Sequence, residues 1–262
     1  MKVRLRLFLR RGIKVKEKLL VGLLLLIELK VSTVEAGNIF SFSADIYNQY
    51  IWRGQNLNDE EVLQPAISVT ARGLTGSLWS NIDLTNRNVK AGKLNEVDLT
   101  LDYTDSFCGM DNLTFSGGLI HYRFPNTTFA PTIELYGGMT WQIKLSPTIM
   151  LYRDLVEING SYVMLGFGHS FDKIFITDER CCWELQLRIS LGLGSPGYNQ
   201  SYFGSEHWGF NDLTLIIGLP ISVSHWTFRP VINYSTILSG DIRQSVNQPD
   251  NFWFGLSVVT AF

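Results

Sequence analysis

Hydrophobic and polar residues alternate with a period of two along much of the chain after Gly37. The clearest run lies between Cys182 and Gly194, where every second residue from Trp183 to Leu193 is apolar and the residues between them are polar or small. Successive side chains of a β-strand point to opposite faces, so this period predicts a strand with one face in an apolar medium. No window in this part of the chain shows a sustained helical period.

The length of these runs distinguishes them from the strands of most soluble proteins. The apolar face between Trp183 and Leu193 continues for about eleven residues without a charge, whereas strands of globular proteins most often have about five or six residues. A tilted strand of about ten residues covers the apolar band of roughly 25 Å that a membrane barrel presents to lipid. The strands are therefore predicted to cross a lipid bilayer.

The repeated pattern predicts an all-β fold, a transmembrane antiparallel up-and-down β-barrel of about 12 strands, with 10 to 14 as the range. Short and long connections alternate along the chain, as expected when tight turns face the periplasm and long loops face outward. Residues 173–180 form a longer connection than the periplasmic side favours, and Pro230 inside a strand predicts a bulge or a misplaced strand boundary. The predicted strands are residues 39–53, 64–72, 74–85, 94–105, 111–124, 130–142, 146–154, 160–172, 181–193, 209–221, 225–237 and 251–262.

The end of the chain continues the same alternation and stops on an aromatic residue. Phe252, Phe254, Leu256, Val258 and Phe262 share one face. Every backbone N–H and C=O group must find a partner in lipid, so this last strand is predicted to pair with the first and close the barrel.

The beginning of the chain differs in character from the rest. Residues 1–36 hold nine of the 22 Lys and Arg residues but three of the 24 Asp and Glu residues, and an apolar run extends from Leu19 to Leu29. A basic stretch, an apolar run too short to span a bilayer as a helix and small residues before Gly37 predict a secretory signal peptide over 1–36. The alternative is an uncleaved anchor. Residues 37–262 would then form the barrel, in the outer membrane of a bacterial cell after cleavage.

The remaining charge and the cysteines limit the classes of partner. Residues 37–262 are acidic overall and contain no cluster of Lys or Arg, which argues against nucleic acid. Cys108 is isolated and Cys181 adjoins Cys182, so one disulfide from Cys108 to this pair or three free thiols are both open. No metal or cofactor motif is present, and no cofactor is expected.

Two stretches resemble a known family. The segment Q-Y-I-W-R-G-Q-N-L, the following Q-P-A-I-S-V and then G-S-L-W-S-N-I resemble the TorF-type porins, and the terminal Phe resembles the insertion signal of bacterial outer-membrane barrels. The residues at the matching places are Tyr50, Arg53, Gly54, Pro65, Ala66, Gly76, Trp79, Ser80 and Asn81. The resemblance implies a barrel with presumed passive transport. A weaker likeness to the MltA-interacting scaffold barrels leaves a non-conducting role open.

A barrel of this size would have a narrow polar lumen. Twelve tilted strands close into a cylinder roughly 24 Å wide, which leaves a lumen of roughly 10 Å inside the side chains. Such a lumen predicts a porin-like channel for passive diffusion of small polar solutes or ions, with outer-membrane lipid around it. The alternatives are pairing of these charges with one another, such as Glu184 with Arg188, and a non-conducting barrel that binds a periplasmic or external partner. The pore-lining candidates are Arg53, Asp98, Asp102, Glu134, Glu184, Arg188 and Arg229.

An enzyme is not expected, and no catalytic residue is predicted. None of the four histidines precedes a serine by two residues, the spacing that would place both side chains on one face of a strand. His169 and Ser170 are neighbours and point to opposite faces. A protease-like pair of His207 with Glu206 or Asp212 is the remaining enzymatic alternative; a lipid-modifying barrel enzyme is less favoured.

Overall fold

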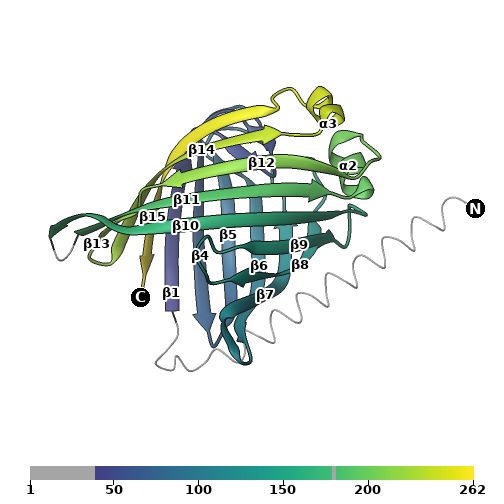
Figure 1. Cartoon of the computed structure of the whole chain (residues 1–262). Helices are drawn as coiled ribbons and strands as arrows, with labels where there is room; N and C mark the ends of the chain where they lie inside the picture. Colours follow the sequence, from purple (N-terminus) through teal and green to yellow (C-terminus); the bar gives the residue numbers. More distant parts are fainter. Residues whose placement is uncertain (1–38, 179–180) are drawn as a thin grey trace, which may run out of the picture. The chain divides into compact units, whose positions relative to one another are not determined.

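The computed structural model describes residues 39–178 and 181–262, and the predicted signal peptide over 1–36 lies outside these residues. Within the described residues, long strands form the wall of a barrel and shorter elements lie on their connections (Figure 1). The wall strands are β1 (Ile39–Tyr47), β4 (Val62–Ala71), β5 (Leu74–Asp83), β6 (Lys93–Phe107), β7 (Met110–Arg123), β8 (Thr132–Trp141), β9 (Thr148–Asp154), β10 (Ser161–Asp178), β11 (Cys181–Gly194), β12 (Gly209–Gly218), β14 (Trp226–Ile237) and β15 (Asp250–Ala261). The shorter elements are β2 (Tyr50–Trp52), β3 (Gln55–Asn58), α2 (Pro196–Phe203), β13 (Ile221–Val223) and α3 (Gly240–Ser245).

Each wall strand pairs antiparallel with its sequence neighbours, and the first strand pairs with the last. The short β13 pairs with β11 and β14 and so continues β12. Phe42 of β1 lies opposite Thr260 of β15, and backbone hydrogen bonds of 3.1 and 2.8 Å join Phe40 to Phe262. The described strands therefore form a closed 12-stranded antiparallel barrel, which confirms the predicted fold and the pairing of the terminal strand.

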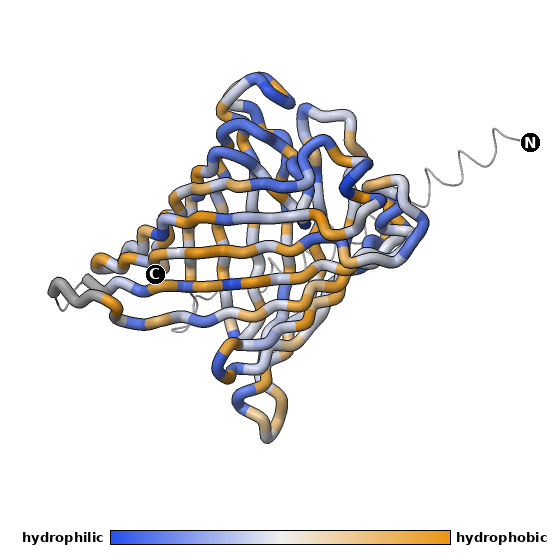
Figure 2. The backbone as a smooth tube through the Cα atoms, turned by 45° about the horizontal axis from the view of Figure 1, so that its top comes forward, coloured by the Kyte–Doolittle hydropathy of each residue, from blue (hydrophilic) through white to orange (hydrophobic). Residues whose placement is uncertain are grey.

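The alternation of side chains separates an apolar outer face from a polar inner face. On β15, Phe252 and Phe254 are 58% and 55% exposed, whereas the intervening Trp253 is 8% exposed and Ser257 1%. Apolar and polar residues alternate along the wall strands in the same way in Figure 2. Leu187 of β11 is exposed, as the predicted register requires.

The connections differ between the two ends of the barrel. We call the end that carries Ile39 and Phe262 the terminal end and the opposite end the loop end. Tight turns such as Arg72–Gly73 and Cys108–Gly109 lie at the terminal end, whereas β2, β3, α2 and α3 lie on the loop-end connections. Cys108 is exposed and in no disulfide; the side chains of the other two cysteines lie outside the described part. No helix among the described residues is long and apolar enough to span a membrane.

Two predicted boundaries were wrong. The first strand was predicted to run to Arg53, but it ends at Tyr47, and residues 50–58 form a separate two-stranded hairpin, β2–β3. Residues 173–180 were predicted as a connection, but β10 continues to Asp178 and pairs there with Cys181 of β11. The resulting β10–β11 hairpin extends beyond its neighbours at the terminal end (Figure 1).

Pro230 forms no bulge, because the strands on both sides of it keep their register. Pro230 pairs with Leu256 of β15 in an unbroken register. On its other side the Pro230 carbonyl accepts a bond of 3.0 Å from the Leu219 N–H, in the short gap between β12 and β13. Proline has no backbone N–H to donate back to this strand, so the pairing loses one hydrogen bond and needs no inserted residue.

Candidate functional site

The β2–β3 hairpin reaches into the barrel lumen at the loop end. Its two-residue turn, Arg53–Gly54, has positive φ at both positions, 47° and 79°, as a type I′ hairpin turn requires. A Cβ atom on Gly54 would lie 2.6 Å from Cβ of Asp212 on β12 and 2.7 Å from Cδ1 of Ile237 on β14. Only glycine therefore fits the tip of the hairpin where it meets the wall.

Arg53 extends from this tip to the part of the wall that lies across the lumen from β1. Its Nη1 and Nη2 atoms donate to Oε1 and Oε2 of Glu134, and both distances are 2.8 Å. Glu134 lies on β8, which is the fifth strand from β1 in one direction and the seventh in the other, so it lies nearly opposite the strand after which the hairpin begins. The hairpin and its arginine thus span the lumen. The two side chains are 9% and 6% exposed, and Tyr122 donates a further bond of 2.9 Å to Glu134.

Aromatic rings surround the guanidinium group. The Arg53 Cζ atom lies 4.5 Å from the Trp52 ring centroid, 4.4 Å from Tyr152, 4.5 Å from Tyr162 and 5.9 Å from Tyr198. These distances fall within the roughly 6 Å over which a cation is attracted to a ring face. We call the set Trp52, Glu134, Tyr152, Tyr162 and Tyr198 the Arg53 cage.

The groups of the cage that lie on the connections keep fixed protonation states. Burial by itself acts to lower the pKa of Arg53, but its neighbours, among them the Glu134 carboxylate, outweigh burial and hold that pKa above its ordinary value. Burial raises the pKa of the Tyr198 hydroxyl well above its ordinary value. The cage therefore contains a charged guanidinium against a neutral phenol.

The lumen at the level of the hairpin is filled. Asn58 of the hairpin is 2% exposed, and wall residues with inward side chains are buried to the same degree, including Asn81, Asp83, Asn211, Ser235 and Asn251. Asn81 accepts a bond of 2.9 Å from Gln64 and donates one of 2.7 Å to Asn95. Beside these polar groups, α2 and α3 contribute an apolar cluster with the wall, made of Tyr162, Tyr198, Phe203, Ile237 and Ile242. These buried side chains fill the part of the loop end that they line.

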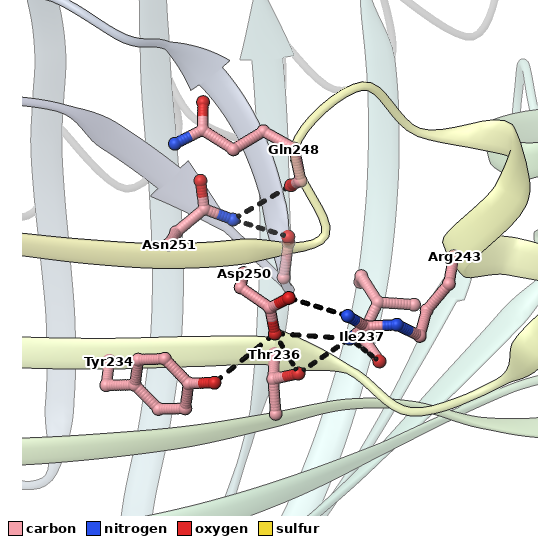
Figure 3. Close-up of polar contacts among 8 residues, drawn as sticks. Tyr234, Thr236, Ile237, Arg243, Gln248, Asp250 and Asn251 are labelled. Carbon is pink, nitrogen blue, oxygen red and sulfur yellow. Dashed lines mark hydrogen bonds and ion pairs between the residues drawn. The ribbon is translucent and has the colours of Figure 1, made fainter.

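The rim of the loop end holds the hairpin and α3 to β14 and β15 (Figure 3). Arg243 of α3 forms an ion pair of 2.6 Å with Asp250, which also accepts a bond of 2.6 Å from Thr236. One residue further, Asn251 donates to the Gly54 carbonyl at 3.5 Å and accepts from Asn56 at 3.0 Å. Polar contacts of the hairpin with β15 thus adjoin the contacts that anchor α3.

The structure joins two of the predicted pore-lining residues and separates the others. Arg53 and Glu134 form the central ion pair; Asp98 lies near Glu134, as a half-buried residue with one carboxylate oxygen unpaired among the described residues. Asp102 accepts bonds from Tyr136 and Thr104 at 2.6 and 2.8 Å. Arg53 was predicted on a wall strand, which is wrong, because it lies on the inserted hairpin.

The remaining candidates lie away from the cage. Glu184 accepts a bond of 3.4 Å from Ser170 and, within the described residues, forms no ion pair with Arg188. Arg188 is exposed, and the buried Nε atom of Arg229 has no partner in the described part of the chain. These three residues are spread over β11 and β14 rather than gathered at one constriction.

Sequence reasoning missed the wall tyrosines around Arg53 and Glu134. Tyr122, Tyr152 and Tyr162 all occupy positions on the polar, inward faces of their strands, where an aromatic residue interrupts the pattern. That interruption was the available signal. Trp79 also points inward and lies 5.8 Å from the Tyr50 ring of the hairpin.

His207 and Asp212 do not form the protease-like pair considered from the sequence. Asp212 is 2% exposed and accepts a bond of 2.8 Å from Tyr162, whereas Glu206 and His207 are exposed and line a cleft of about 470 Å³ between α2 and α3. Across the residues that the structure describes, no group of three or more His, Cys, Asp or Glu side chains could hold a metal ion.

The fold and the filled loop end define a class of protein, a closed 12-stranded barrel of the outer-membrane type with an inserted hairpin. No protein-family model and no curated protein sequence matches the chain. The likeness to TorF-type porins and to MltA-interacting barrels therefore stays a prediction.

Similar solved structures are outer-membrane barrels. LpxR from Salmonella typhimurium aligns with a TM-score of 0.52 and 8% identity, over 84% of this chain and 99% of that one. An outer-membrane channel from Pseudomonas putida F1 aligns with a TM-score of 0.43 and 8% identity over 89% and 98% of the two chains. The channel DcaP of Acinetobacter baumannii gives 0.43 and 7% over 88% and 99%. At these identities the likeness concerns the fold and not the activity.

Proposed function

We propose that this protein is an outer-membrane channel for small polar solutes or ions, closed at its loop end by the β2–β3 hairpin and opened when the hairpin withdraws. The observation that supports this most directly is the Arg53–Glu134 ion pair. It joins the separate two-stranded hairpin to a wall strand across the lumen. The apolar outer face and a likeness in fold to outer-membrane barrels support the location.

The chemistry of the contact favours a movable hairpin over a permanent seal. Besides its aromatic contacts, the hairpin meets the wall through two polar side chains: Arg53 binds Glu134 on β8, and Asn56 binds Asn251 on β15. Water can replace such partners when the hairpin leaves, and a buried ion pair gains little over its separated, hydrated charges. Release of the hairpin therefore requires less free energy than release of an apolar segment of the same area.

The wall that the hairpin leaves behind would prefer cations. Arg53 pairs with Glu134 and lies near Asp212, and its withdrawal would leave these two carboxylates, with other buried wall carboxylates at the loop end, as a negative constriction, which selects cations in channels. These carboxylates are Asp83, Glu96, Glu134, Asp154 and Asp212.

The test compares two glycines with the same backbone strain. Gly54 and Gly92 have φ of 79° and 78°, but a Cβ on Gly92 has no atom within 4 Å, whereas one on Gly54 clashes with the wall. Both substitutions to alanine carry the strain of positive φ, and Gly54→Ala also expels the hairpin tip. In planar bilayers we expect mostly closed wild-type channels, frequent cation-preferring openings for Gly54→Ala, and wild-type behaviour for Gly92→Ala.

The same conductance measurement distinguishes the channel from a second candidate, a non-conducting scaffold barrel. The apolar cluster around Ile237 and Ile242, both no more than 1% exposed, favours that alternative because it resembles a fixed core. A variant in which a short Gly-Ser linker replaces residues 49–59 removes the hairpin altogether. If this correctly folded variant also fails to conduct, the channel is refuted and the scaffold stands.

A further inference from the structure

We propose that the Arg53 cage is a binding site for organic cations with a guanidinium or substituted ammonium group, and that Arg53 occupies it as a tethered competitor. The binding site itself is independent of conduction; only the step from ligand binding to channel opening rests on the proposed function. The competitor is part of the hairpin, so a ligand that takes its place would release the hairpin from the wall.

The contacts of Arg53 are those that recognise a guanidinium ion in general. A planar group with two parallel N–H donors matches a carboxylate in a bidentate pair, and Glu134 accepts both bonds at 2.8 Å. Three ring centroids lie between 4.4 and 4.5 Å from the guanidinium carbon. A charge buried among aromatic faces and a carboxylate is the arrangement that proteins use to bind organic cations.

Most of the cage belongs to the wall and not to the hairpin. Glu134 lies on β8, Tyr152 on β9, Tyr162 on β10 and Tyr198 on α2, and only Trp52 belongs to the hairpin. The strands β8, β9 and β10 are successive neighbours in the sheet. Withdrawal of the hairpin therefore leaves one carboxylate and three phenol rings in place.

Contacts that do not involve Arg53 hold this remaining part of the cage in shape. Tyr122 donates to Glu134 at 2.9 Å, and Tyr162 donates to Asp212 at 2.8 Å. The Tyr162 and Tyr198 rings lie 5.4 Å apart. A site preorganised by its own walls loses little conformational entropy when a ligand binds. Inorganic cations gain less here, because they keep a tighter hydration shell and cannot form the bidentate pair.

The first experiment measures binding in the variant Arg53→Ala, which empties the cage. Methylguanidinium chloride at millimolar concentration is compared with sodium chloride at equal ionic strength, and the melting temperature of the purified barrel is followed. We expect a saturable rise of about 3–6 °C with methylguanidinium, and none in Arg53→Ala combined with Glu134→Gln. The variant Arg243→Ala, which removes an exposed guanidinium paired with Asp250, is the matched control and gains nothing. Equal melting temperatures in both salts would overturn the binding site.

The second experiment tests competition in the wild-type chain. Trypsin cleaves after arginine, and the Arg53–Gly54 bond becomes accessible only when the hairpin leaves the cage. Methylguanidinium also enters the protease's own specificity pocket, which holds an aspartate, so cleavage at Arg53 is expressed relative to cleavage at Arg87, whose side chain is 54% exposed. We expect this ratio to rise at least threefold with methylguanidinium and to stay constant with sodium chloride.

The outcomes separate the site from the channel. A raised cleavage ratio with no conductance would keep the binding site and reject the proposed transport. Channel openings without any change in the ratio would reject Arg53 as a competitor. If Arg53→Ala does not fold, the cleavage ratio of the wild-type chain decides alone, and a constant ratio overturns the proposal.

Discussion

The Arg53–Glu134 ion pair allows a double-mutant cycle that tests how the hairpin is held. Arg53→Met keeps most of the side-chain volume but removes the charge and both donors, and Glu134→Gln keeps the shape and removes the opposite charge. The two side chains are 9% and 6% exposed. Because each single substitution leaves one buried charge without its partner, each should lower the free energy of unfolding by about 3–5 kcal/mol.

The double variant should lose about 1–3 kcal/mol less than the two single variants together. With both charges removed, no uncompensated ion remains in the lumen, and neutral groups of similar volume are often as stable as the buried pair they replace. Arg53→Met also weakens three close ring contacts, each worth about 0.5–2 kcal/mol. We therefore expect a coupling energy of about 1–3 kcal/mol.

Urea unfolding of the barrel in lipid vesicles, followed by tryptophan fluorescence, measures the four free energies. The control cycle uses Arg243→Met and Asp250→Asn, an ion pair whose side chains are 36% and 45% exposed. Solvent screens that pair, so its coupling should be much smaller and should fall with salt. The idea that a buried ion pair holds the hairpin would be refuted if both single variants lost less than about 1 kcal/mol of unfolding free energy. Additive losses in the double variant would refute it as well.

Three further predictions test the wall. Leu187→Arg places a charge in lipid and should cost about 2–4 kcal/mol at mid-bilayer, whereas Gln186→Arg faces the lumen and should be nearly silent in urea unfolding; equal effects would reject the register. Gly118→Ala should impair folding, judged by heat-modifiable electrophoretic mobility, because a Cβ there lies 2.2 Å from a backbone oxygen, and Gly76→Ala should not, since nothing lies within 4 Å. A membrane-impermeant maleimide should label Cys108 from the periplasmic side alone, and labelling from outside would reverse the orientation.

The wall of the barrel could be predicted because its cause is local. A strand between lipid and a polar lumen needs a side-chain period of two, and Leu187, Phe254 and Ser257 show that period in the sequence as well as in the structure. Closure also followed, since an unpaired strand edge cannot exist in lipid. The long β10–β11 hairpin did not follow, because it extends past its neighbours and the requirement of lipid no longer applies there.

The hairpin itself carried a local signal that alternation obscured. Tyr50, Ile51 and Trp52 continue the pattern of β1, so the period alone extends the first strand to Arg53. The pair Arg53–Gly54, followed by a polar strand, is compatible with a two-residue hairpin turn. The cage could not be derived in this way, since its members come from β8, β9, β10 and α2 and meet only after the barrel closes.

Two groups of side chains fill the loop end, one beneath α2 and α3 and one beneath the β2–β3 hairpin, and the difference between them predicts where the barrel opens. Beneath α2 and α3 the lumen is sealed by apolar side chains such as Phe203, Ile237 and Ile242, and separating them would expose hydrocarbon to water at roughly 25 cal/mol per Å². Beneath the β2–β3 hairpin it is sealed by aromatic rings around Arg53 and Tyr50 and also by Arg53 itself, asparagines and carboxylates, and water solvates these polar groups. A barrel that only had to be closed would be at least as stable with apolar residues throughout. The polar half is therefore the part suited to reversible release, with the helices remaining in place as the fixed side of the opening.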